Sequence, residues 1–404
     1  MDRPGGLGLW GHFTTIALLL ICTVGGGSLA ATCSVRDRDS LLAFKNQMTD
    51  ADGVLASWKK TTDCCTWQGI TCDANARVTG ITIEASCPTC GGGQKLIAKP
   101  LNFGGPLGNL KSILKQLSLI NVQVQFKIPI PPVFFTLGKL DFLQLEGCGF
   151  IGSLPNELGN LRLLQELKIS GNRLSGGVPN TISNLKELRI LQLGSNQLTT
   201  LGSWKLTLLQ KLDRVDFSRN KITGSIPKWL GGLTLAGPFF NELLLSFNQF
   251  SGTIPAELCN IRGMRYLALR GNKLSGRIPA GIGKCTSLMY LILGQNSLSG
   301  PLPRELGKLK NLVELTADKN KLSGPLPREL GDLPELTFVK LQNNKITGGI
   351  PSNYGPFDPL VSDPIDLTNN MLKGPIPKAM QSLSANAFRP GNPGLCGPPL
   401  SNPC

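Results

Sequence analysis

Residues 164–172 read LQELKISGN, and the same phrase returns as LRILQLGSN at 188–196, MRYLALRGN at 264–272 and LTFVKLQNN at 336–344. The asparagine that closes the phrase recurs in steps of 24, 24, 24, 28, 24, 24, 24 and 26 residues, at Asn172, Asn196, Asn220, Asn248, Asn272, Asn296, Asn320, Asn344 and Asn370. A nearly fixed interval of this length is typical of one supersecondary unit copied many times. The sequence therefore predicts a repeat protein.

Each phrase has the form L-x-x-L-x-L-x-x-N, which is the leucine-rich repeat pattern. Leu167 and Ile169 alternate with other residues, so both point to one face of a short strand. The amide of the closing asparagine can satisfy backbone groups of adjacent turns. One repeat cannot bury its apolar face alone, whereas stacked repeats share a continuous core. We therefore expect a right-handed α/β solenoid whose concave wall is a parallel sheet.

The pattern extends toward the N-terminus with lower fidelity. In LDFLQLEGC, residues 140–148, Cys148 takes the place of the asparagine, and Val122 and Ser86 take it in the two preceding repeats. The chain should therefore contain about twelve turns. Parallel strands lie ~4.8 Å apart, so the sheet should be roughly 50 Å long. A surface of this length suits a protein or a polysaccharide better than a small molecule.

Residues 1–30 are predicted to be a secretory signal, with Arg3, an apolar run over 13–24, and Ser28 and Ala30 placed for cleavage. No later stretch of the chain is apolar over the length of a membrane span. We expect the mature chain to be secreted, in the extracellular space or cell wall. Of the 12 cysteines, Cys22 lies in the signal, and most others cluster at the two ends, as in disulfide-linked caps. The odd number that remains predicts at least one free thiol.

The composition argues against catalysis. The only histidine, His12, lies in the predicted signal, which excludes Ser-His-Asp and Cys-His nucleophiles and histidine-ligated zinc in the mature chain. Glu314 and Asp318 share one repeat and are the better-placed carboxylate pair for a glycosidase, but two solvated carboxylates on an open sheet are the simpler interpretation. We expect a protein that is not an enzyme and that uses no cofactor or metal.

The formal net charge is +15 at pH 7. Outside a cell such a charge favours anionic polysaccharide, membrane or acidic protein as partners. No basic helix or aromatic-basic motif of a nucleic-acid reader is present, so we expect no nucleic-acid partner.

Segments such as LSGRIPAGIGKC and LSGPLPRELGKL connect the strands, with Gly where the chain leaves a strand and Pro where no ladder donor is needed. RDSLLAFKNQM, LASWKK and DCCTWQGITCD precede the repeats, and FRPGNPGLCGPPLSNPC follows them. These modules, in this order, resemble plant extracellular leucine-rich repeat proteins: polygalacturonase-inhibiting proteins and the ectodomains of receptor-like proteins and receptor kinases. The resemblance implies an N-terminal cap over 31–76, repeats over 77–380 and a C-terminal cap over 381–404.

The same resemblance implies disulfides Cys33–Cys64 and Cys65–Cys72 in the first cap and Cys396–Cys404 in the last. A short cap lacks the buried area to remain folded without such a link, which stabilises by ~2 to 4 kcal/mol. Cys87 and Cys90, in CPTCGGG, could form a redox pair or half of a zinc site, but a local disulfide is favoured because no further ligands are available. We expect Cys148, Cys259 and Cys285 to be buried thiols.

The sequence contains neither the phosphate-binding loop of a kinase nor a transmembrane segment. The chain is therefore expected to be a secreted protein in its own right or an ectodomain without its anchor. The first alternative favours a binder or inhibitor that acts on an extracellular protein or wall polysaccharide. The second favours a sensor of peptide signals that is held at the cell surface by a membrane receptor kinase. In either case we expect a monomer.

Two groups of residues are candidates for ligand binding. The first is expected on the concave face and gathers aromatic and apolar residues beside an arginine, namely Leu244, Tyr266, Ala268, Arg270, Tyr290, Ile292 and Phe338. Exposed aromatic residues with an adjacent arginine are typical of binding hot spots, although such residues also suit an ordinary strand.

The second group, the basic rib, follows the asparagine in five repeats and consists of Arg173, Lys221, Lys273, Lys321 and Lys345. It could bind a polyanion or simply be a solvated edge. In addition, residues 234–240, TLAGPFF, lengthen one repeat by four residues, either for binding or as a strain-relieving bulge.

Overall fold

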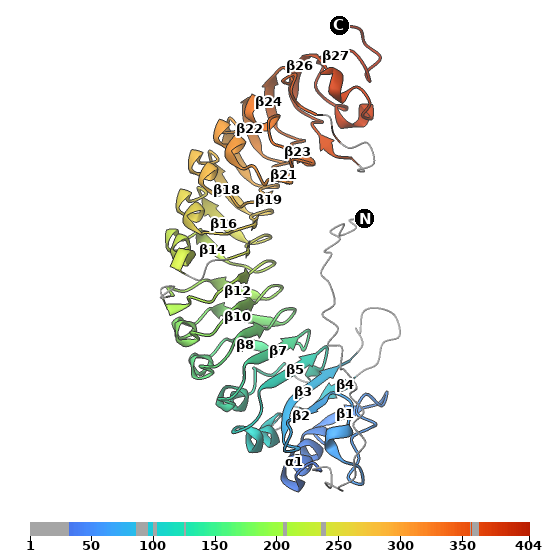
Figure 1. Cartoon of the computed structure of the whole chain (residues 1–404), viewed down its shortest axis with the longest axis vertical. Helices are drawn as coiled ribbons and strands as arrows, with labels where there is room; N and C mark the ends of the chain where they lie inside the picture. The colour runs from blue at the N-terminus through green and yellow to red at the C-terminus, as the bar shows by residue number, and fades with distance from the viewer. Residues whose placement is uncertain are drawn as a thin grey trace, which may run out of the picture. The chain divides into compact units, whose positions relative to one another are not determined.

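The computed structural model describes residues 32–85, 96–99, 103–124, 127–204, 208–235, 240–355, 357 and 363–404. Residues 32–404 form one unit in which the repeats follow one another in chain order (Figure 1). Among the described residues, no helix is both long and apolar enough to cross a membrane. Cys87 and Cys90 lie outside the described residues, as do residues 236–239 of the insertion.

The repeats contribute one strand each to a large parallel sheet. This sheet has 13 strands, of which β2 (Ile70–Cys72) runs antiparallel to β3 and belongs to the N-terminal cap. The other twelve are the predicted turns of the solenoid. They are β3 (Val78–Glu84), β5 (Gln116–Ile120), β7 (Phe142–Glu146), β9 (Glu166–Lys168), β11 (Ile190–Gln192), β13 (Arg214–Asp216), β15 (Glu242–Leu244), β17 (Tyr266–Ala268), β19 (Tyr290–Ile292), β21 (Glu314–Thr316), β23 (Phe338–Lys340) and β25 (Ile365–Asp366).

A second layer of strands follows the asparagines. The sequence pattern did not predict this layer. An eight-stranded sheet and a three-stranded sheet form here. The larger contains β14 (Thr223–Ser225), β16 (Gln249–Gly252), β18 (Lys273–Gly276), β20 (Ser297–Gly300), β22 (Lys321–Pro325), β24 (Lys345–Gly348), β26 (Met371–Pro375) and β27 (Gly394–Cys396); the smaller contains β8 (Ile151–Ser153), β10 (Arg173–Gly177) and β12 (Gln197–Thr200). The residues between Asn and Pro therefore pair with the next repeat.

The helical segments between the strands are 3-10 helices. Five-residue examples begin directly after a proline, as in η8 (Ala256–Asn260), η9 (Ala280–Lys284) and η10 (Arg304–Lys308). Proline fixes φ and lacks a donor, so it suits the position before a short helix. Figure 1 shows these segments on the outer side of the curve and the large sheet on the inner side.

The asparagine ladder binds each repeat to the one before it. Asn196 donates from Nδ2 to the Ile169 carbonyl oxygen at 2.7 Å, and its Oδ1 accepts from the Leu174 amide at 3.1 Å. Both partners lie in the preceding repeat. Equivalent pairs of bonds recur at the other predicted asparagines, as at Asn320 and Asn370. The ladder is therefore a repeated bridge between backbones.

The ladder has one more rung than the sequence predicted. Asn392, in the C-terminal cap, donates to the Leu367 carbonyl oxygen and accepts from the Leu372 amide at 2.8 and 3.0 Å. Toward the other end, Cys148 replaces the asparagine and its thiol donates to the carbonyl oxygens of Leu119 and Glu146, both at 3.3 Å. Burial raises the pKa of this thiol to about 12, so Cys148 remains protonated.

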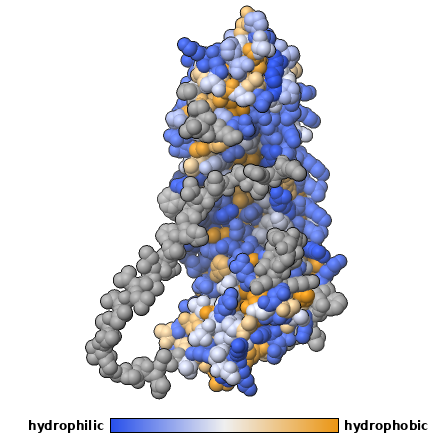
Figure 2. Space-filling model, turned by 90° about the vertical axis from the view of Figure 1, so that its right-hand side faces the viewer, coloured by the Kyte–Doolittle hydropathy of each residue, from blue (hydrophilic) through white to orange (hydrophobic). Residues whose placement is uncertain are grey.

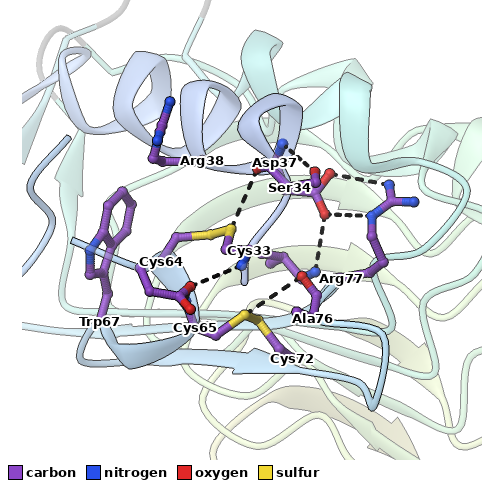
Figure 3. The surroundings of a disulfide bond; sticks show 12 residues. Cys33, Ser34, Asp37, Arg38, Cys64, Cys65, Trp67, Cys72, Ala76 and Arg77 are labelled. Carbon is purple, nitrogen blue, oxygen red and sulfur yellow. Dashed lines mark hydrogen bonds and ion pairs between the residues drawn. A yellow bond between two sulfur atoms is a disulfide. The ribbon is translucent and has the colours of Figure 1, made fainter. Parts of the chain in front are cut away.

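The N-terminal cap packs α1 (Val35–Lys45) against the first repeats, with Ser34 accepting from the Asp37 amide at its N-terminus. The Nε atom of Arg77 lies 2.8 Å from Oδ2 of the buried Asp37 and forms an ion pair with it. Burial alone would raise the pKa of Asp37, but hydrogen bonds from Arg77, Val78 and Ser34 outweigh it, and the pKa is lowered. Figure 3 shows this pair beside the disulfides Cys33–Cys64 and Cys65–Cys72.

The disulfides agree with the implied cap pairings at three places and add one link. Cys396 joins Cys404 in the C-terminal cap. The expectation that Cys259 and Cys285 are thiols was wrong, because they form a disulfide with their Cα atoms 4.7 Å apart. They are 26 residues apart, close to one repeat, so they lie on neighbouring turns. Cys148 is the free cysteine among the described residues.

We predict that Asn196→Ala destabilises the protein by ~2 kcal/mol or more, because buried carbonyl and amide groups of two repeats lose their partners. Urea denaturation followed by circular dichroism would measure the change. Gln197→Ala is the control, since its side chain accepts an exposed hydrogen bond from the Lys221 ammonium group. Equal stability of the two variants would show that the ladder contributes nothing beyond an ordinary surface contact.

Peptide mapping without reduction is expected to recover four links among the described residues: Cys33–Cys64, Cys65–Cys72, Cys259–Cys285 and Cys396–Cys404. Cys148 should react with an alkylating reagent only after denaturation, because it is buried and its thiol stays protonated. Rapid alkylation of Cys259 or Cys285 in the native protein would contradict the link between the two repeats.

Candidate ligand-binding surface

Two rows of side chains cross the concave face in strict register. In the first row, Glu242 pairs with Tyr266, Tyr266 with Tyr290, Tyr290 with Glu314, and Glu314 with Phe338. The second row lies two residues further along each strand and contains Leu244, Ala268, Ile292, Thr316 and Lys340. The residue between the two rows in each strand is buried in the core, as Leu267 is in β17. Both rows therefore face outward.

The two tyrosines form a stacked pair. Their ring centroids lie 5.1 Å apart and their planes differ by 25°. Both side chains are half-buried. Burial raises the pKa of Tyr266, and the nearby Glu314, Glu242 and Tyr290 raise it further, so the phenol is neutral at physiological pH. The pair offers a partly exposed aromatic surface in the middle of the face.

The apolar residues beside the tyrosines are not equally accessible. Leu244 and Ile292 are half-buried, whereas Ala268 is only 6% exposed. The expectation that Ala268 contributes to the exposed patch was therefore wrong. Its methyl group lies in register between two longer side chains, which shield it. We define the concave strip as Leu244, Tyr266, Tyr290 and Ile292.

Arg270 is already occupied by a carboxylate. Its Nη1 and Nη2 atoms donate to the two oxygens of Asp318 at 2.7 and 3.2 Å. Asp318 lies two repeats away and is 2% exposed, so the expectation of a solvated carboxylate was wrong. The intervening residue is Gly294, where an added Cβ would lie 2.1 Å from Asp318 Oδ1. Glycine at this position leaves room for the ion pair. The alternation of residues along a strand does not predict such a contact between repeats.

Phe247 is a surface residue that the sequence analysis missed. Its side chain is 38% exposed, its φ is +56°, and the Arg219 guanidinium lies 4.8 Å from its ring centroid. The ring covers Gly271, where an added Cβ would lie 2.6 Å from it. The signal was a phenylalanine directly before Asn248, where the other repeats carry Gly, Ser, Arg, Gln, Lys or Asn. Phe247 lies three residues after Leu244, at the end of the same repeat.

The last predicted member, Phe338, is half-buried and separated from the tyrosine pair by Glu314. Figure 2 views the side that carries the large sheet and shows small apolar patches among hydrophilic surface. At the other end of the row, Glu242 forms an ion pair with Arg214 at 3.1 Å. Burial raises the pKa of Glu242, against the opposing charge of Arg214.

The basic rib lies on another part of the surface. All five of its side chains are exposed, and four of them begin strands of the second layer. Two ammonium groups, those of Lys221 and Lys273, donate to Gln197 and Gln249 of the preceding repeats at 2.9 and 3.1 Å. Gln197 and Gln249, which occupy the same position in the intervening repeats, therefore separate Arg173, Lys221 and Lys273.

An open hollow lies near the N-terminal end, with a volume of about 530 Å³. Its lining mixes both signs of charge with exposed Leu163, and includes Asp73, Lys115, Lys139, Asp141 and Glu187. Burial raises the pKa of Asp141. These residues belong to the cap and to repeats that precede the tyrosine pair along the chain.

Comparison with known proteins supports the repeat assignment. The family model "Leucine rich repeat N-terminal domain" matches residues 35–73, and the model "Leucine Rich Repeat" matches 163–185, 211–233, 240–261 and 287–309. Receptor-like protein EIX1 of Solanum lycopersicum is 32% identical over 161 residues, covering 38% of this chain and 15% of the relative. A polygalacturonase inhibitor of Pyrus communis is 41% identical over 68 residues, covering 17% of this chain and 20% of the relative.

Among solved structures, the leucine-rich repeat ectodomain of the Arabidopsis thaliana receptor kinase GASSHO1/SCHENGEN3, in complex with CASPARIAN STRIP INTEGRITY FACTOR 2, matches with a TM-score of 0.72 and 27% identity. The match covers 89% of this chain and 42% of the ectodomain. The chain thus spans less than half of each of these three proteins. The chain contains a leucine-rich repeat N-terminal domain and leucine-rich repeats, and it is similar to plant receptor-like proteins and to a polygalacturonase inhibitor.

Proposed function

We propose that this chain is a secreted, non-enzymatic recognition protein that binds an extracellular protein or peptide through the concave strip. The stacked, half-exposed Tyr266–Tyr290 pair is the observation that carries the proposal. Aromatic side chains that are already held in place lose little conformational entropy on binding, and they dominate the energetics of many interfaces. Leu244 extends the apolar contact on the neighbouring strand β15, and Ile292 extends it along β19, the strand of Tyr290.

The relatives support a protein or peptide as the ligand. The GASSHO1/SCHENGEN3 ectodomain was solved in complex with CASPARIAN STRIP INTEGRITY FACTOR 2, and the relative from Pyrus communis is named as an inhibitor of polygalacturonase. Two modes of action follow for this chain. It acts as a soluble inhibitor of a wall-degrading enzyme, or as a sensor that works with a membrane receptor kinase.

The basic rib favours a second, weaker activity, which is attachment to acidic wall polysaccharide. The net charge of +15 and the five exposed side chains of the rib support it. Such an attachment would hold the protein in the cell wall without using the concave strip. It would therefore be compatible with protein recognition.

Replacement of both tyrosines, Tyr266→Ala with Tyr290→Ala, is expected to weaken capture of the partner about 30-fold, the effect of losing ~2 kcal/mol at an interface anchor. The measurement compares proteins captured from a plant cell-wall extract by the natural chain and by the variant, quantified by mass spectrometry. Ile190→Ala is the matched control, because Ile190 occupies the same row on β11 and is also half-buried. A partner retained equally by all three folded proteins would exclude the concave strip.

The basic rib predicts retention on a polygalacturonate column that falls as salt rises, because charge attraction fades as the Debye length shrinks to ~3 Å near 1 M salt. Changing Lys221, Lys273, Lys321 and Lys345 to Gln should elute the protein at lower salt. The control changes four other exposed lysines to Gln, namely Lys59, Lys60, Lys111 and Lys186. Equal shifts in both variants would mean that net charge alone, and no particular rib, causes the attachment.

A further inference from the structure

Glu314 is a half-buried carboxylate on the concave face with no ionic partner. Among the residues that the structure describes, no ion pair or hydrogen bond involves its side chain, whereas Glu242 pairs with Arg214 and Glu166 with Lys168 in the same row. Burial raises the pKa of Glu314, against the opposing charges of Lys340 and Arg270. A carboxylate that loses hydration without gaining a partner is destabilising.

The two cations whose charges act on Glu314 both have other hydrogen-bond acceptors. Lys340 lies on the adjacent strand, but its ammonium group donates to the backbone carbonyl oxygen of Asp363. Arg270 donates from both terminal nitrogens to Asp318. Asp318 balances the charge of Arg270, whereas Lys340 keeps its charge and donates to a neutral carbonyl oxygen. Glu314 is left as an unmatched acceptor on a surface that faces outward.

The surroundings of Glu314 fit a flat cation. Tyr290 and Phe338 flank it in register on the two neighbouring strands, both half-buried. Thr316 follows on the same face of β21; it is 7% exposed, and its hydroxyl has no partner among the described residues. An aromatic face attracts a cation, with Arg used more often than Lys. A carboxylate accepts two parallel hydrogen bonds from a guanidinium group.

We propose that Glu314, between Tyr290 and Phe338, binds an arginine side chain of an extended peptide segment that lies across the concave face. An extended chain advances ~3.3 Å per residue, so the side chain two residues away lies ~6.6 Å along the row, over the Tyr266–Tyr290 pair. The ligand therefore carries an arginine two residues from an apolar side chain. This inference rests on the proposed function and specifies the chemistry of the partner.

The positive charge of the whole chain does not prevent this contact. Exposed charges more than about 8 Å away are largely screened at physiological ionic strength. Close to the site, Asp318 balances the charge of Arg270, and Lys340, which keeps its charge, donates to the Asp363 carbonyl oxygen. A guanidinium is also weakly hydrated compared with an ammonium group, so its transfer to a half-buried site is less costly.

The test uses a random heptapeptide display library, selected at 0.15 M salt on the chain and on Glu314→Gln. We expect arginine to be enriched about fivefold among peptides selected on the natural chain, and the enrichment to disappear on Glu314→Gln, which keeps the shape of the side chain but removes its charge. Glu166→Gln is the matched control, because Glu166 lies in the same row on β9 but is paired with Lys168. It should keep the enrichment.

A selected peptide then enters a double-mutant cycle measured by fluorescence anisotropy. Glu314→Gln should lower the affinity for the peptide about 10-fold. It should not change the affinity for a version of the peptide in which the arginine is replaced by alanine. One outcome overturns this inference and leaves the proposed function intact. In it, the selected peptides lose affinity for the Tyr266→Ala variant, but they show no preference for arginine, or the preference is the same on the Glu314→Gln variant. A library that yields no peptide dependent on either tyrosine overturns both.

Discussion

The structure depends on one interaction, the side-chain amide of an asparagine that joins two successive backbone turns. Asn196 reaches a carbonyl 27 residues upstream and an amide 22 residues upstream, and both groups are buried. Unpaired, such groups are costly, so each turn is stable only against the correct neighbour. The same bonds fix the register of adjacent strands. Once register is fixed, every outward position of one repeat lies beside the same position of the next, and rows of side chains follow.

The sequence predicted as much of the molecule as its periodicity encodes. The asparagine steps and the repeat pattern around them predicted the strands of the large sheet, the face of each residue in those strands and the membership of the two concave rows. Contacts that cross repeats are not encoded in this way. The burial of Asp318 depends on an arginine two turns away and on the absence of a side chain at Gly294. The disulfide between Cys259 and Cys285 depends on the way two neighbouring turns stack.

Exposure was the second property that alternation could not supply. Ala268 points outward, yet its longer neighbours cover it, and Phe247 lies outside the alternating strand altogether. Its left-handed backbone places it at the exit of the repeat, where small and polar residues are usual. The candidate surface is therefore smaller in its middle than the pattern indicated, and an exposed aromatic residue lies at a position where the pattern predicted none. Glu314 acquires its importance only by comparison, since Glu166, Glu242 and Asp318 all have cationic partners.

The disulfide Cys259–Cys285 lies in the segments that lead into β17 and β19, the strands of Tyr266 and Tyr290. In a repeat protein each turn contacts only its neighbours, so bending and local opening are normally distributed among all interfaces. The Cys259–Cys285 bond restricts such bending and opening at the interface between its two turns. The disulfide therefore restrains relative motion of the two turns that present the stacked rings. The spacing of the two rings is therefore fixed before a ligand binds. Binding does not have to supply the free energy that would be needed to align the two turns.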